Sequence, residues 1–151
     1  MAYKAWPNGF RQRFLALWQR SLGLSAMRAE NALRLLQQAY AEPHRHYHTF
    51  EHIRFCLSQF DLVARQMSSP ETVELAIWFH DVVNKPGVSD NEQQSAELFR
   101  RLADGVMDAD LIDDVVGLIL VTTHQRQPEL PDHQFICDID LASFGCPWEC
   151  F

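Results

Sequence analysis

The apolar positions of this chain recur mainly every three or four residues, which is the spacing of one face of an α-helix. The clearest stripe runs from Ile53 through Cys56, Phe60 and Val63 to Met67. We find neither a convincing segment with the alternation of a β-strand nor an internal repeat or low-complexity linker. The pattern therefore predicts an all-α fold.

About seven helices follow from this periodicity and from the residues that start or stop helices. We expect them over about residues 10–22, 25–41, 49–67, 70–83, 108–124 and 132–144, with a further helix that begins near residue 89. Ser25, Thr49 and Ser69 are the predicted N-caps, and Ser89 with Glu92 three residues later has the spacing of a capping box.

The length and composition fit one domain over residues 1–151, with a hydrophobic fraction of 47%. No apolar run reaches the roughly 20 residues that span a bilayer, and the first residues lack the plan of a secretory signal. We therefore expect a cytoplasmic protein whose four cysteines are free thiols. A net charge of −7 argues against duplex nucleic acid as a partner, since phosphate backbones recruit clustered Lys and Arg.

Four of the seven histidines lie within nine positions, in the segment HRHYHTFEH at residues 44–52. His48 and His52 are four residues apart, so they share one helix face or flank the same helix start.

The segment LAIWFHDVV places a histidine and an aspartate at the end of an apolar helix. His80 continues the stripe of Val73 and Ile77, so its ring is expected in the core. Adjacent helical residues such as His80 and Asp81 point about 100° apart and pair poorly. A shared cation would neutralise the carboxylate and bind the imidazole.

Two aspartates, Asp138 and Asp140, lie in the late helical segment FICDIDLASFG. Taking Phe135, Cys137 and Leu141 as the buried side, the periodicity does not choose between the two aspartates.

The order H…HD…D on a helical chain resembles the HD superfamily of metal-dependent phosphohydrolases. YHTFEH is similar to the Tyr-His-x-x-x-His segment of cyclic-nucleotide phosphodiesterases in that superfamily. The blocks EPHRHYHTFEHI, AIWFHDVV, DNEQQSAELF and DIDLASFG resemble a bacterial group of HD-type hydrolases over about residues 30–148. The resemblance implies an HD-domain-like helical bundle.

The same resemblance implies roles for particular residues. The metal ligands would be His52, His80, Asp81 and Asp140, with Asp138 as the second choice for the last position. His48 would protonate the leaving oxygen, and Asp81 would also orient the attacking water. Glu92 and His124 are candidates for additional ligands, and the candidates for substrate contact are His44, Arg45, His46 and Lys85.

The expected function is hydrolysis of a small phosphomonoester or phosphodiester, such as a nucleotide, by water that the metal activates. The ligand types accept Mn, Fe, Ni, Zn or Co, and Mg is a further candidate. Two alternatives are an HD-fold di-iron oxygenase and a catalytically inactive module that binds metal or nucleotide. Chains of the HD-type group continue beyond DLASFG, so we expect a C-terminally shortened form.

Overall fold

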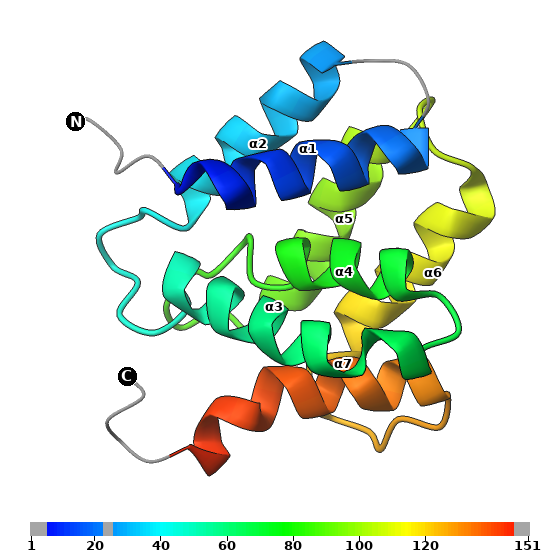
Figure 1. Ribbon diagram of the computed structural model, residues 1–151. Helices are drawn as coiled ribbons and strands as arrows, with labels where there is room; N and C mark the ends of the chain where they lie inside the picture. The colour runs from blue at the N-terminus through cyan, green and yellow to red at the C-terminus, as the bar shows by residue number, and fades with distance from the viewer. Residues whose placement is uncertain (1–5, 23–25, 147–151) are drawn as a thin grey trace.

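The computed structural model describes residues 6–22 and 26–146. These residues form seven α-helices and no strand, so the prediction of an all-α bundle is confirmed (Figure 1). The helices are α1 (Asn8–Leu22), α2 (Ala26–Ala39), α3 (Phe50–Val63), α4 (Pro70–Phe79), α5 (Asn91–Ala103), α6 (Ala109–Val121) and α7 (Pro131–Leu141). The short 3₁₀ helices η1 (Ala64–Gln66) and η2 (Ala142–Gly145) follow α3 and α7.

Helix α4 is the centre of the bundle. It packs against α1, α3, α5, α6 and α7, and crosses the middle of Figure 1. Every residue from Thr72 to Phe79 is buried, as expected for a helix that is apolar on all sides. The one acidic residue in this stretch, Glu74, accepts a hydrogen bond of 2.6 Å from Arg13 of α1. Whatever follows the last turn of α4 is therefore positioned by five neighbouring helices.

An aromatic cluster fixes the last turn of α4. Trp78 lies edge-on to Phe14 of α1, with ring centroids 5.4 Å apart, and Phe79 lies 5.1 Å from Phe99 of α5. Aromatic pairs at such separations contribute about 0.5–1.5 kcal/mol each beyond the area that they bury. The cluster anchors the backbone immediately before His80.

Helix α4 ends at Phe79, four residues earlier than the periodicity predicts. The carbonyl groups of Asp81 and Val82 accept hydrogen bonds from the Arg45 side chain, 36 and 37 residues away in sequence, instead of continuing a helical ladder. Apolar periodicity carries no information on such a distant donor.

The capping interactions predicted at Thr49, Ser69 and Ser89 are not formed. Thr49 and Ser69 hold the N-cap positions of α3 and α4, but neither side chain makes a capping hydrogen bond. The predicted box of Ser89 and Glu92 is wrong, because α5 has Asp90 as its N-cap. Asn91 holds the preceding loop instead, since its side chain accepts from the backbone N–H of Lys85. The Ser25 cap lies outside the described residues.

Asp132 of α7 binds the backbone that leads into α4. Its carboxylate accepts hydrogen bonds from the backbone N–H groups of Ser68 and Ser69, at 2.9 and 2.8 Å. We expect Asp132→Ala to lower the free energy of unfolding by about 1 kcal/mol, the typical net contribution of a lost hydrogen bond. Urea denaturation measures this change.

Asp110→Ala is the matched control for Asp132→Ala. Asp110 is an exposed acid in the first turn of α6, and Asp132 is a half-buried acid in the first turn of α7. Removal of Asp110 therefore reproduces the loss of a favourable interaction with the helix dipole. Equal destabilisation by the two substitutions would show that the bonds to Ser68 and Ser69 contribute nothing.

In the described part of the chain, no helix is both long and apolar enough to cross a membrane. Cys56 and Cys137 are free thiols, as predicted, and Cys150 lies outside the described residues.

Candidate metal site

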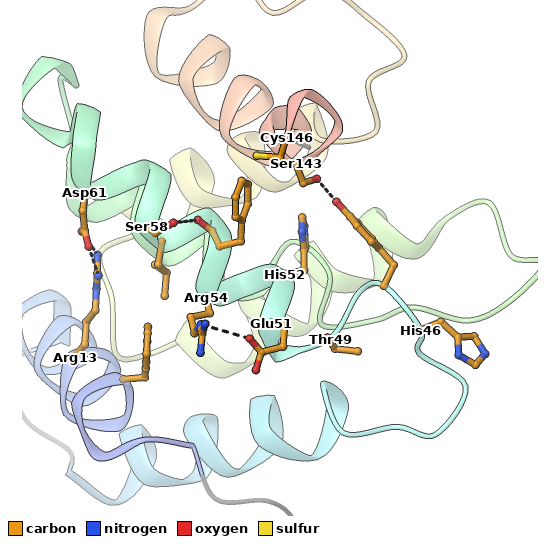
Figure 2. Close-up of a pocket in the computed structure, with 14 residues that line it drawn as sticks. Arg13, His46, Thr49, Glu51, His52, Arg54, Ser58, Asp61, Ser143 and Cys146 are labelled. Carbon is orange, nitrogen blue, oxygen red and sulfur yellow. Dashed lines mark hydrogen bonds and ion pairs between the residues drawn. The ribbon is translucent and has the colours of Figure 1, made fainter. Parts of the chain in front are cut away.

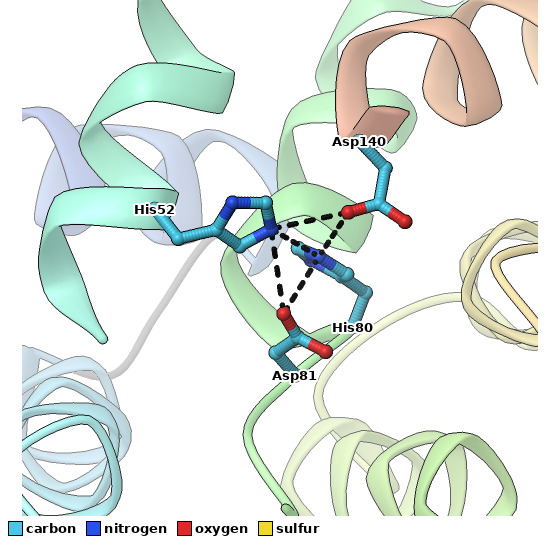
Figure 3. Close-up of side chains that lie close together, drawn as sticks. All are labelled: His52, His80, Asp81 and Asp140. Atoms are coloured by element: carbon cyan, nitrogen blue, oxygen red, sulfur yellow. Dashed lines mark hydrogen bonds and ion pairs between the residues drawn. The ribbon is translucent and has the colours of Figure 1, made fainter. Parts of the chain in front are cut away.

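Four polar side chains from three helical segments converge on one point (Figure 3). His52 comes from the first turn of α3, His80 is the C-cap of α4 and Asp81 follows it, and Asp140 lies near the end of α7. Helices α3 and α7 both pack against α4, which brings residues that are up to 88 positions apart into contact. The structure thus brings together the four residues that the resemblance implies as ligands.

The distances within this group suit a metal ion. The Nε2 atom of His52 lies 3.3 Å from His80 Nε2, 3.4 Å from Asp81 Oδ2 and 3.1 Å from Asp140 Oδ1. His80 Nε2 lies 3.2 Å from the same Asp81 oxygen and 3.3 Å from the same Asp140 oxygen. Ligand bonds of about 2.0–2.2 Å to a tetrahedral ion would separate its ligand atoms by about 3.3–3.6 Å. All four ligand atoms lie within 4.8 Å of one another, so the group could hold a transition metal ion.

The His80 ring has the tautomer that a metal ligand needs. Its Nδ1 atom lies 2.9 Å from the backbone carbonyl oxygen of Ile77. Because a carbonyl oxygen only accepts, Nδ1 carries the hydrogen, and in the neutral ring Nε2 is left with a lone pair directed at the cluster. A backbone partner on the far nitrogen is the usual support for a histidine that binds a metal.

Asp81 supplies a second observation that a cation would suit the cluster. Its Oδ2 atom is buried and has no hydrogen-bond partner, although both imidazole Nε2 atoms lie within 3.4 Å. A buried carboxylate oxygen without a partner is costly. A metal ion at the centre of the group would satisfy this oxygen.

The imidazoles and carboxylates of the group stabilise one another's charged forms. Burial lowers the pKa of His80, but the carboxylates of Asp81 and Asp140 outweigh burial and hold it well above its ordinary value. Burial raises the pKa values of Asp81 and Asp140, yet the neighbouring imidazoles lower both below the ordinary value. The carboxylates therefore stay ionised, and positive charge between them is favoured. A divalent ion would supply that charge in place of imidazole protons.

His48 lies beside the group without joining it. Its ring is half-buried, with its centroid 6.0 Å from that of His52 and 5.0 Å from that of Tyr47. Its charge, when protonated, also favours the ionised form of Asp81. His48 is thus close enough to the cluster to act on a molecule bound there.

His124 reaches the edge of the site. Its Nε2 atom lies 2.7 Å from Asp140 Oδ2, the oxygen that faces away from His52. The backbone of His124 has a positive φ of 53°, which is uncommon outside glycine and tends to occur at functional positions. His124 therefore orients the Asp140 carboxylate from outside the four-residue group.

The other candidates lie outside this group. Asp138 is exposed on α7, and Glu92 is half-buried in the first turn of α5. Lys85 is exposed and donates a hydrogen bond to Gln94. His46 is exposed, and His44 Nε2 lies 2.6 Å from the carbonyl oxygen of Asn84.

The position of Arg45 argues against its predicted role in substrate contact. Its side chain has 0% exposure. The guanidinium donates to the backbone carbonyls of His48, Asp81 and Val82 and to the carboxylate of Glu42. A group enclosed by these acceptors cannot contact a substrate phosphate.

Two neighbours of the site were not predicted. The Sγ atom of Cys56 lies 3.6 Å from His52 Nε2, and burial raises the pKa of the thiol to about 12, so it stays protonated. Tyr47 lies with its ring centroid 5.0 Å from that of His52 and hydrogen-bonds to Ser143 of η2. The spacing of four between His52 and Cys56 was a usable signal, whereas nothing local links Tyr47 to Ser143.

A cavity of about 750 Å³ borders His52 and runs along α3 (Figure 2). Its wall includes aromatic rings, among them Phe10, Tyr47 and Phe55, and two Arg–carboxylate pairs. Small-molecule sites typically have volumes of about 300–1,000 Å³. The cavity is thus of a size that accepts a small organic molecule beside the candidate metal site.

Comparisons with protein families, with curated proteins and with solved structures found no match to this chain.

Proposed function

We propose that this protein is a metal-dependent phosphohydrolase that acts on a small phosphomonoester or phosphodiester. The observation that carries the proposal is the group of two buried imidazoles and two half-buried carboxylates, in which one buried carboxylate oxygen has no hydrogen-bond partner. The order of these residues in the sequence, together with the resemblance to HD-type hydrolases, favours phosphoester hydrolysis among the reactions that such a site supports.

A metal ion bound here would polarise phosphoryl oxygens and lower the pKa of water. Four side chains, His52, His80, Asp81 and Asp140, would hold it. Asp81 presents one oxygen to the cluster, and its second oxygen points away from the ligand atoms (Figure 3). That second oxygen would accept a hydrogen bond from water and orient it.

His48 would act as the general acid. Histidine has an unperturbed pKa of about 6.5, which allows it to donate a proton to a leaving oxygen near neutral pH. Its ring lies next to the cluster and only half-buried, so a substrate can reach it. The cavity beside His52 would receive the organic part of the substrate.

The function is tested with purified protein that carries no histidine tag, loaded in turn with Mn²⁺, Fe²⁺, Co²⁺, Ni²⁺ and Zn²⁺. We expect turnover of at least one member of a panel of phosphomonoesters and phosphodiesters. A chelator should abolish that turnover and the metal should restore it. Binding of a nucleotide without turnover would favour an inactive binding module, and about two iron ions per chain with uptake of O₂ would favour a di-iron oxygenase.

His48→Ala separates catalysis from metal binding within this test. We expect turnover to fall by about 100-fold while the metal content stays unchanged, since general acid catalysis typically contributes at least that factor. His133→Ala, on α7 and outside both the ligand group and the wall of the cavity, is the control and should keep wild-type turnover. Loss of metal in His48→Ala would instead make His48 a ligand.

A further inference from the structure

The geometry points to Arg45 as a positioning residue of the metal site. It joins the segment that leads to His48 and His52 with the segment that carries His80 and Asp81. The inference rests on the metal binding that the proposed function requires, and does not depend on which reaction follows.

The Arg45 guanidinium forms hydrogen bonds with the backbone of both segments. Its Nη1 atom donates to the carbonyl oxygen of Asp81 at 2.6 Å and to that of His48 at 3.1 Å. Its Nη2 atom donates to the carbonyl oxygen of Val82 at 2.8 Å. One acceptor thus belongs to the backbone of a candidate ligand, and another lies four residues before His52.

The chemistry of a helix end explains why arginine is needed here. The last carbonyl groups of α4 and the residues after it have no helical partners and carry the negative end of the helix dipole. A planar guanidinium with donors in a fixed fork can serve several carbonyls at once and keeps its charge when buried. The ammonium group of a lysine is a compact point charge and cannot span the same three acceptors.

Neighbouring residues hold Arg45 in place. Glu42 accepts from its Nε atom at 2.9 Å, and its guanidinium carbon lies 5.2 Å from the centroid of the Tyr40 ring. The hydroxyl of Tyr40 in turn donates to the carbonyl oxygen of Trp78 at 2.9 Å. Donors from residues 40–45 therefore bind the backbone on both sides of His80 and Asp81.

These hydrogen bonds fix the positions of the ligand atoms before a metal ion binds. Partners of metal ligands typically change metal affinity by about 10–100-fold when they are removed. Arg45→Lys keeps the positive charge but loses the fork, so we expect Co²⁺ to bind at least about tenfold more weakly. The visible absorption of bound Co²⁺ should also change, because it depends on ligand geometry.

Arg13→Lys is the matched control. Arg13 is half-buried, whereas Arg45 is fully buried, and it likewise binds acceptors from other segments, Asp61 and Glu74, away from the metal site. We expect Arg13→Lys to lower the melting temperature and to leave the affinity and absorption of Co²⁺ unchanged. Both variants are titrated with Co²⁺ against a chromophoric chelator, without substrate.

The outcomes are distinguishable. If the wild type binds no Co²⁺, the metal site and the proposed function both fail. If the wild type binds Co²⁺ and folded Arg45→Lys binds it equally well, with only a lower melting temperature, the role of Arg45 is overturned. Should Arg45→Lys not fold, Glu42→Ala decides, since this exposed residue orients the guanidinium. Weaker Co²⁺ binding by Glu42→Ala supports the role, and unchanged binding overturns it.

Discussion

Replacing His80 by alanine is expected to abolish stoichiometric metal binding and to reduce phosphoester turnover to background. His80 Nε2 lies 3.2–3.3 Å from the ligand atoms of His52, Asp81 and Asp140, so it contacts every other member of the group. Its loss leaves three donors, and the two carboxylates among them each lose one of their two buried imidazole neighbours. Elemental analysis of tag-free protein, after reconstitution and desalting, measures the metal content.

His133→Ala is the control for this substitution. His133 lies on α7 and is half-buried, but it is not a member of the ligand group. The control should retain about one metal ion per chain, and both variants should keep the helical circular dichroism of the wild type. A folded His80→Ala protein with a full complement of metal would rule out the site described above.

Asp140→Asn is expected to weaken metal binding by at least about 100-fold, which corresponds to about 2.7 kcal/mol. The substitution keeps the shape of the side chain and removes its charge. The Oδ1 atom of Asp140 lies 3.1 Å from His52 Nε2, and the surrounding imidazoles lower the pKa of this carboxyl. The ionised form is thus the form that the site stabilises. Competition with a chelator of known affinity gives the dissociation constant.

Asp138→Asn is the control for this substitution, since Asp138 lies two residues earlier on the same helix. Asp138 is exposed and stands outside the ligand group, so the metal affinity should stay within about twofold of the wild type. The opposite result, in which Asp138→Asn loses metal and Asp140→Asn keeps it, would mean that the last ligand has been assigned to the wrong aspartate.

The helical pattern predicted the fold and the position of His80 because both depend on local periodicity. His80 continues a stripe whose other members are buried, and its ring is buried too. Periodicity could not choose between Asp138 and Asp140, because α7 does not have a clean apolar face. Cys137 is buried, but Leu141, which was expected on the same side, is 42% exposed.

Arg45 and the start of α5 were predicted wrongly for a common physical reason. Arg45 occurs in a polar segment of histidines and looks like a solvated cation, yet its partners are carbonyl groups 36 and 37 residues away. Ser89 and Glu92 have the spacing of a capping box, but the Asn91 side chain binds the Lys85 backbone and holds the loop outside the helix. A local sequence pattern does not show which distant backbone groups will bind a side chain, or which neighbouring contact will compete with a predicted cap.

The distribution of the ligands over α3, α4 and α7 has a consequence for folding. His52 and Asp140 are separated by 88 residues, so an ion bound between them acts as a cross-link that closes a long loop of the chain. Such a link forms only after the three helices have docked, and its binding free energy is then added to the cooperative stability of the whole bundle. Local opening of α7 would break the link, so the dissociation rate of a bound ion would set an upper limit on the rate at which that helix detaches.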